Sequence, residues 1–203
     1  MIVKLIACLL LIIPLYAQRV TTVLYSNGKV RSEGMVDEQQ KVGEWKYFYP
    51  NGTRMAIENF ENGMLDGVVT YFFPDGSIQG KEHWDMGTLN DSSIYYYSDG
   101  TIERSGRYKK GQYDGQWKHF HPNGKLERII NYSEGLPNGE VKVFSEDGKR
   151  LQSGSYLNGK ENGYWEFYNP DGQLDYSGEY KDGERIGEWF QYDRKGRKKP
   201  WKY

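Results

Sequence analysis

Two closely spaced histidines are the first residues whose types and spacing could support chemistry. His119 and His121 lie two residues apart, so on an extended strand both imidazoles would face the same way, about 7 Å apart. The pair could supply half of a metal site, but a zinc site needs three or four ligands. The third histidine is His83 and the single cysteine is Cys8, both distant in the sequence. We therefore expect no metal and no cofactor, and we expect the two histidines to replace aromatic residues.

Other kinds of reaction centre leave no pattern in the sequence. Acidic side chains are numerous but scattered, whereas a glycosidase needs two carboxylates that converge across a cleft. The sequence contains no Gly-x-Ser-x-Gly nucleophile turn, phosphate-binding loop or dinucleotide-binding fingerprint. We therefore predict that the chain is not an enzyme. An enzyme of unknown type would need a pocket that this sequence does not predict.

Regularly spaced turns indicate the elements that would position any functional residue. Asn-Gly and Asp-Gly are strong hairpin signals because both turn positions need φ > 0. Such a pair recurs every 24 residues without insertion or deletion, the last one in degenerate form. The eight pairs begin at Asn27, Asn51, Asp75, Asp99, Asn123, Asp147, Asp171 and Lys195. A fixed period of this length indicates one supersecondary unit that is repeated and stacked.

Steps of 24 residues also align aromatic side chains. One position of the repeat reads Phe48, Phe72, Tyr96, Phe120, Phe144, Tyr168 and Tyr192, and another reads Trp45, Val69, Ser93, Trp117, Val141, Trp165 and Trp189. Alternating aromatic and charged residues suit half-exposed strands, and helical periodicity is missing beyond the first residues. The sequence therefore predicts an all-β, elongated single-domain array of stacked antiparallel β-hairpins, with about seven repeats and atypical end units.

Alternation along each strand sorts these positions onto two faces. Residues 45, 47 and 49 share one face, and residues 46 and 48 point to the other. Position 48 is aromatic in every repeat, so we expect it to form the packing contact between repeats. The more variable face is the candidate binding surface, because Tyr and Trp are favoured anchors; packing of its tryptophans on the next repeat is the alternative. The candidate binding residues are Trp45, Tyr47, Tyr49, Trp117, His119, His121, Trp165, Phe167 and Trp189.

Residues 1–17 lie outside the repeat and have the pattern of a secretory signal peptide. Lys4 precedes an apolar run from Leu5 to Leu15, and Ala17 is a small residue at the expected cleavage point. We expect residues 18–203 to form the mature domain, exported to a periplasmic, secreted or envelope-associated location. A lipid anchor on Cys8 and an uncleaved anchor are the alternatives. Cleavage would remove the only cysteine and change the net charge from −1 to −2, a balance that does not favour nucleic-acid binding.

These features resemble the MORN (membrane occupation and recognition nexus) repeat family. The resemblance is closest to its variant bacterial form, which has a Tyr-Tyr-x-Asn-Gly core and a later Gly-x-Trp. It covers roughly residues 22–196, and its clearest segments are Trp45 to Gly52, Gly115 to Gly124 and Gly163 to Gly172. The resemblance implies a stack of β-hairpins that binds proteins or, in some members, membrane lipid. Bacterial relatives are often described as the antitoxin half of a toxin–antitoxin pair.

Two classes of function are consistent with this sequence. The first is a non-enzymatic, exported scaffold that presents an elongated aromatic face to an unidentified protein partner. The second is a peripheral membrane-lipid or glycan-binding module, because aromatic platforms suit sugar rings and a basic tail suits lipid head groups. That tail contains Arg194, Lys195, Arg197, Lys198, Lys199 and Lys202. The sequence leaves the partner and the oligomeric state open.

Overall fold

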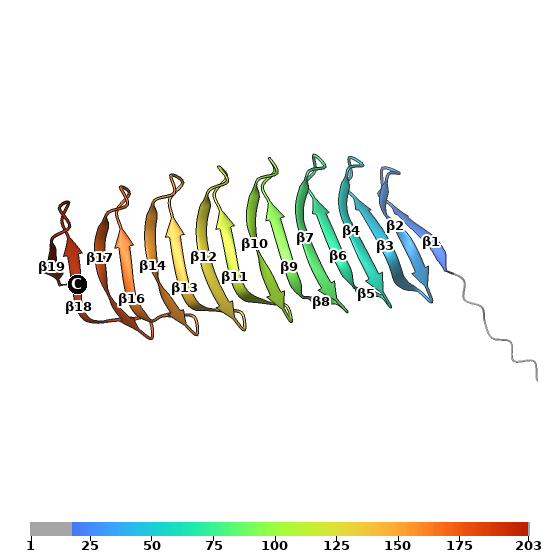
Figure 1. Cartoon of the computed structure of the whole chain (residues 1–203). Helices are drawn as coiled ribbons and strands as arrows, with labels where there is room; N and C mark the ends of the chain where they lie inside the picture. The colour runs from blue at the N-terminus through green and yellow to red at the C-terminus, as the bar shows by residue number, and fades with distance from the viewer. Residues whose placement is uncertain (1–17, 203) are drawn as a thin grey trace, which may run out of the picture.

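A computed structural model of the chain describes residues 18–202, and these form one open, antiparallel β-sheet of 19 strands. The sheet is a long strip of hairpins whose turns gather along its two edges, with β1 at one end and β19 at the other (Figure 1). Residues 18–202 contain no helix and therefore no helix able to cross a membrane. The predicted all-β hairpin array is confirmed. The predicted signal peptide, residues 1–17, lies outside the described residues.

The strands follow the period that the turns predict. They are β1 (Arg19–Leu24), β2 (Val30–Asp37), β3 (Gln40–Phe48), β4 (Arg54–Glu61), β5 (Met64–Leu65), β6 (Gly67–Phe72), β7 (Ile78–Asp85), β8 (Thr88–Leu89), β9 (Asp91–Tyr96), β10 (Ile102–Lys109), β11 (Gln112–Phe120), β12 (Leu126–Ser133), β13 (Leu136–Phe144), β14 (Arg150–Leu157), β15 (Lys160–Glu161), β16 (Gly163–Tyr168), β17 (Leu174–Lys181), β18 (Glu184–Tyr192) and β19 (Lys198–Trp201). The two-residue strands β5, β8 and β15 are short leading pieces of β6, β9 and β16.

Each strand pairs with the strands next to it in sequence, so the sheet is a continuous meander. In the central part, β9 pairs with β10, β10 with β11 and β11 with β12. Asparagine in the tight turns ties neighbouring hairpins together: Asn123 Oδ1 accepts the backbone N–H of Lys125 at 3.0 Å, and its Nδ2 donates to the carbonyl of Glu146 in the next turn at 2.9 Å. The turn residues therefore close their own hairpin and also fix the spacing of the tips.

A bulge interrupts the first half of each forward strand. Gly115 adopts φ +67°, a left-handed conformation that glycine tolerates without a steric penalty, and the register of β10 on β11 shifts beside it, between Ser105 and Arg107. Asp91 replaces glycine at this position in its own repeat and still has φ +62°. The repeated backbone thus holds a conformation that Asp adopts more readily than most residues.

The core lies on the face that carries the tryptophans. Trp117 and Trp165 are fully buried, and Trp45 and Trp189 are 4% and 1% exposed. Each indole covers a glycine on the preceding strand: a Cβ placed on Gly106 would lie 2.2 Å from Cδ2 of Trp117. The same contact recurs in the pairs Gly34–Trp45, Gly154–Trp165 and Gly178–Trp189. Absence of a side chain at this position therefore makes the space in which the ring lies flat.

This arrangement corrects the expected packing contact. The position that includes Phe48 was expected to be the contact between repeats, but its residues are only half-buried and lie on the opposite face. The tryptophan position is buried in every repeat, including those in which Val69, Ser93 or Val141 replaces the indole. The tryptophan position therefore packs inside in every repeat, and the glycine eleven residues before each tryptophan makes room there for an indole.

The repeats without tryptophan also lack that glycine. Glu58 precedes Val69, Glu82 precedes Ser93, and Ile130 precedes Val141 by the same eleven residues. A large side chain at the glycine position and an indole at the tryptophan position would compete for one space, since protein interiors are close-packed. The two positions therefore change together along this one chain.

Candidate binding surface

The aromatic face, defined as the side of the sheet that contains Trp45, Trp117, Trp165 and Trp189, has a buried floor and a half-buried row beside it. The floor is held by the backbone as well as by packing: the indole N–H groups of Trp45, Trp117 and Trp165 donate to the carbonyls of Met35, Arg107 and Ser155 at 2.9, 2.9 and 3.1 Å. The row, which we call the outer row, consists of Tyr47, Tyr71, Tyr95, His119, Val143, Phe167 and Gln191.

The structure divides the candidate binding residues into three groups. Trp45, Trp117, Trp165 and Trp189 lie in the core, so the expectation that they face a partner is not met, because each ring is enclosed by a glycine backbone and neighbouring aromatic rings. Tyr47, His119 and Phe167 lie half-buried in the outer row. Tyr49 and His121 lie at the turn edge. The binding role of these last five residues stays a prediction.

Tyr49 and His121 have structural partners at the turn edge. The Tyr49 hydroxyl donates to the carbonyl of Phe72 at 2.8 Å, and Nε2 of His121 lies 2.9 Å from the carbonyl of Phe144. Both contacts span 23 residues and join one repeat to the next. His121 is thereby turned toward a backbone oxygen, and residues 18–202 contain no group of three metal-ligating side chains that could complete a site with it.

Carboxylates lie beside the floor in two of the repeats that lack tryptophan, where Glu58 precedes Val69 and Glu82 precedes Ser93. Glu82 accepts hydrogen bonds from the hydroxyl of Tyr95 at 2.6 Å and from the indole N–H of Trp84 at 3.1 Å. Burial, followed by the nearby Glu82 carboxylate, raises the pKa of Tyr95 to about 12. Burial and Glu82 also raise the pKa of Tyr71. This tyrosine–glutamate network fills the space of an indole, and sequence reasoning missed it because Glu58 and Glu82 read as surface acids.

A basic cluster follows the acidic part of the face. Arg104 is paired directly with His119 across β10 and β11, and His119 is paired with Arg128 across β11 and β12. The Arg104 guanidinium lies 4.2 Å from the centre of the Tyr95 ring, a cation–π contact. Burial, with the charges of Arg128 and Arg104, lowers the pKa of His119 to about 4, so this imidazole is neutral at pH 7. The 24-residue spacing of the two arginines, on both sides of His119, was the signal that could have found this cluster.

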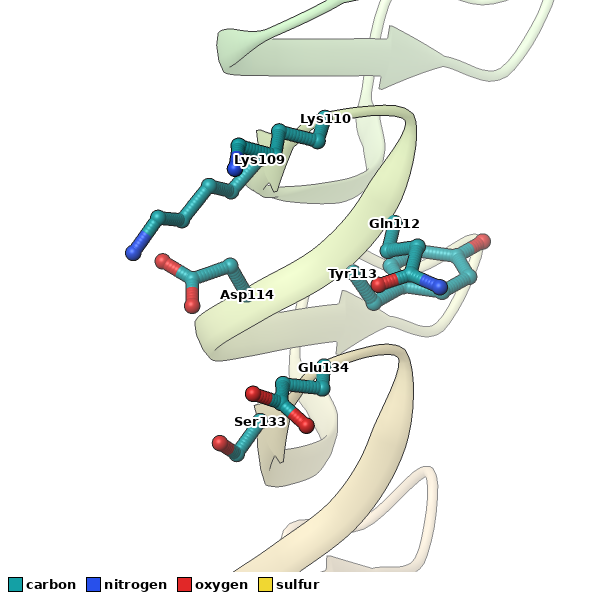
Figure 2. A pocket seen from close by; sticks show the side chains of 7 residues that line it. All are labelled: Lys109, Lys110, Gln112, Tyr113, Asp114, Ser133 and Glu134. Carbon is teal, nitrogen blue, oxygen red and sulfur yellow. The ribbon is translucent and has the colours of Figure 1, made fainter.

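Two hollows lie away from this cluster. One, of about 430 Å³, lies between successive turns and is lined by Lys109, Lys110, Gln112, Tyr113, Asp114, Ser133 and Glu134. Figure 2 shows Lys109 and Asp114 on one side of the strand and Gln112 and Tyr113 on the other, so these side chains do not converge on a common point. The other, of about 570 Å³, lies on the opposite face beside Val68, His83 and Ile94.

The hollow on the opposite face holds the one serine–histidine contact in the described part of the chain. The Ser92 hydroxyl is 3.4 Å from Nδ1 of His83, but the same Nδ1 is 3.0 Å from the Ser92 carbonyl. The carbonyl can only accept, so Nδ1 carries the proton and donates it there. In that tautomer Nδ1 has no lone pair with which to take a proton from the hydroxyl.

The basic tail contributes the last strand. Arg197 pairs with Asp193 at 2.7 Å, and the Lys198 ammonium lies 4.4 Å from the centre of the Phe190 ring. Trp201 on β19 packs 6.1 Å from Trp189 and 4.7 Å from Tyr176, measured between ring centres. The tail therefore covers the C-terminal end of the aromatic floor with an indole and places charge and Pro200 on the edge, where both hinder strand addition.

Comparisons with known proteins place this architecture in a family. Five windows of the chain match the family described as MORN repeat variant: residues 41–62, 65–86, 113–134, 137–158 and 161–182. The repeat that holds Asp91 and Ser93 falls between two windows, although β9 and β10 continue the sheet there. No curated protein matches the chain.

Several solved structures are similar to part of the chain. One is a GtfA/B complex bound to UDP and GlcNAc, with 9% identity and a TM-score of 0.23 over 70% of this chain and 24% of that one. Another is TcdB2-TccC3-TEV, with 10% identity and a TM-score of 0.25 over 89% of this chain and 12% of that one. A third is the Tc holotoxin pore of Photorhabdus luminescens with a mutation in TccC3, with 11% identity and a TM-score of 0.25 over 89% of this chain and 12% of that one. The chain spans less than a quarter of the length of these chains. At such TM-scores the likeness adds nothing to the repeat assignment. The five matched windows cover more than half of the sequence, and the chain belongs to the MORN repeat variant family.

Proposed function

We propose that the protein is a non-enzymatic, exported scaffold that binds a protein partner along the outer row of its aromatic face. The observation that carries this proposal is the contrast between floor and row. The floor is buried in every repeat, whereas the half-buried row changes from tyrosine to histidine, valine, phenylalanine and glutamine along the array. A surface that varies over a constant frame is what a repeat protein uses to recognise an extended partner.

Export rests on the sequence of residues 1–17, whose charged start, apolar run and small residue at position 17 are typical of a signal peptide. The scaffold role rests on the repeat family and on the row.

Two alternatives compete with this proposal. A lipid- or glycan-binding module would use the basic tail or the aromatic rings, yet Arg197 and Lys198 already have partners in β18 and the turn that follows it. A neutralising, antitoxin-like role would also be protein binding, with a toxin as the partner. Each alternative predicts a different kind of ligand, so one capture experiment separates both of them from the scaffold.

The test is affinity capture with residues 18–203 from an envelope extract, using variants matched by position. Tyr47→Ser with Phe167→Ser alters the outer row, and Lys46→Gln with Lys118→Gln alters the opposite face on the same kind of strand. We avoid Trp117 because its removal would damage the core. All three proteins should first show the same far-UV circular dichroism.

A stoichiometric protein that is lost with the row variant and kept with the control supports the scaffold. A partner retained by both variants would place binding elsewhere and contradict the proposal. Enrichment of lipid or polysaccharide without protein would favour the lipid- or glycan-binding module, and a captured toxin would favour the antitoxin-like role.

A further inference from the structure

The strongest unassigned feature is the cluster of Arg104, His119 and Arg128 on the aromatic face. Their strands are adjacent and their positions are paired in register, so the three side chains lie side by side. All three share a face with Trp117, whose ring centre is 6.5 Å from that of His119. The cluster is therefore part of the face, rather than of the solvent-facing turns.

The guanidinium groups are partly buried and lack acceptors. Nε of Arg104 and Nε of Arg128 are both buried, and neither has a hydrogen-bond partner among residues 18–202. The Arg104 side chain as a whole is 33% exposed, so part of it meets solvent. A buried donor without an acceptor is costly, so an incoming acceptor would gain from satisfying both groups.

No carboxylate is hydrogen-bonded to either arginine of the cluster within residues 18–202. Tyr95, Val143 and Gln152 lie on the aromatic face near the cluster, and the one acidic residue that pairing places on this face in the described strands between β9 and β14 is Asp91, opposite Tyr108 at the far end of β9. Glu103 forms an ion pair with Arg104, with one oxygen 3.8 Å from Nη1, which is longer than a hydrogen bond, and the charge of Glu127 acts on His119. Glu82 is already bound by Tyr95 and Trp84. Arg104 therefore has only a long ion pair and both arginines keep donors without an acceptor, which an incoming carboxylate could bind.

We propose that Arg104, His119 and Arg128 form a binding site for the carboxylate side chains of an acidic polypeptide segment. Arginine forks match the planar carboxylate with two parallel hydrogen bonds, and the neutral imidazole adds a third polar group between them. This inference rests on the proposed scaffold function, since it names the chemistry of the partner that the outer row would take. A peptide is favoured because the site continues on both sides into half-buried aliphatic and aromatic side chains, Val143 and Tyr95, which suit a polypeptide.

Binding of an anion should change the ionisation of His119. Burial keeps the imidazole neutral, the charges of Arg128 and Arg104 reinforce this effect, and Glu127 on β12 opposes it. A bound carboxylate would offset the two positive charges, so the pKa of His119 would rise from about 4. Affinity should therefore increase as the pH falls towards about 5, above the pH of about 4.3 around which the glutamate side chains of the peptide themselves become protonated. It should decrease with salt, because the charges lie near the surface.

The test is an NMR titration of residues 18–203 with an acetylated hexaglutamate peptide, following the His119 ring protons and the Nε–Hε signals of arginine. We expect the signals of Arg104, His119 and Arg128 to move together and the pKa of His119 to rise in the complex. Arg104→Gln and Arg128→Gln should each weaken binding by about tenfold, as expected for loss of a charge-assisted contact. Arg107→Gln is the matched control, because Arg107 lies on the same strand but pairs with Asp114; it removes the same charge and should change affinity by less than about twofold.

Each other outcome overturns part of the inference. Absence of any shift, or equal weakening by Arg107→Gln, refutes the site. Tighter binding of inorganic phosphate or of a uronate oligosaccharide than of the peptide refutes the acidic polypeptide as its ligand. Peptide binding without any captured partner would refute the scaffold role and leave the site standing, whereas a partner still captured by Arg104→Gln would refute only the site.

Discussion

The contact between Gly106 and Trp117 predicts a strong energetic coupling between these two residues. A methyl group on Gly106 would lie 2.2 Å from Cδ2 of the Trp117 ring, whereas carbon atoms in contact are about 3.5 Å apart. The ring would have to retreat by about 1.3 Å to restore that contact. It cannot do so easily, because the rings of Tyr108 and Tyr113 pack edge-on against it with centres 5.0 and 4.4 Å away.

The magnitude follows from overpacking. Gly106→Ala should lower the free energy of unfolding by about 2–3 kcal/mol, the range for an extra methyl group in a filled core. Trp117→Val removes the ring and should cost about 2–4 kcal/mol. In a chain that already carries Trp117→Val, Gly106→Ala should change the free energy of unfolding by about zero, because the added methyl group then has room. The repeat that combines Ile130 with Val141 likewise holds a larger side chain at the glycine position where the indole is missing. The expected coupling energy is therefore about 2–3 kcal/mol.

The assay is urea unfolding of the four proteins, followed by far-UV circular dichroism, with the m-values compared to confirm that the same structure unfolds. Ser105→Ala, one residue away and on the opposite face, is the control and should change the free energy by less than about 0.5 kcal/mol. The explanation of the core would be refuted if Gly106→Ala lowered the free energy of unfolding by the same amount, within about 0.5 kcal/mol, in the chain that keeps Trp117 and in the chain that carries Trp117→Val.

Three further predictions test other parts of the structure. His119 has a pKa of about 4 in the folded chain against an ordinary value of 6.5. Between these pH values the unfolded chain binds more protons than the folded chain, so stability should fall as the pH decreases from about 6.5 to 4. His119→Tyr should flatten this part of a plot of melting temperature against pH, and an unchanged slope would contradict the assigned pKa. Tyr97→Phe deletes the hydroxyl that donates to the Phe120 carbonyl at 2.8 Å and should cost about 1 kcal/mol in urea unfolding, while Tyr96→Phe on the other face serves as its control. Trp201→Ala should speed amide hydrogen exchange in β18 and β19 and leave β2 to β4 unchanged, because repeats are stabilised mainly by their neighbours; faster exchange throughout the array would show that the sheet opens as one unit.

The sequence predicted the repeat well because the repeat is encoded locally. Asn-Gly and Asp-Gly turns fix where each hairpin reverses, and an unbroken period of 24 residues fixes how the hairpins stack. The choice of face was harder, because aromatic residues occupy positions of both parities, such as Trp117 and Phe120. Their environment depends on Gly106, which lies on a different strand and is matched to Trp117 only after the bulge at Gly115 sets the register.

The candidate site depended on the same register. Arg104 and Arg128 are 24 residues apart and His119 lies between them, but only the pairing of three strands shows that they are neighbours on one face. Periodicity also concealed Glu58 and Glu82, which look like exposed acids until their tyrosine partners are known. Positions that break a repeat therefore carry much of its specific chemistry, and their partners come from the adjacent repeats.

The meander topology has a consequence for how the chain folds. Residues paired between strands are close in sequence: Arg19 and Val36, among the most distant, differ by 17 positions in a chain of 203. The relative contact order is therefore about 0.1 or less, a value typical of helical bundles rather than of β-sandwiches. A hairpin can form as soon as its own residues are free to pair, without waiting for a distant segment. A chain emerging with its N-terminus first could thus build its sheet progressively, each new hairpin adding to an edge already formed.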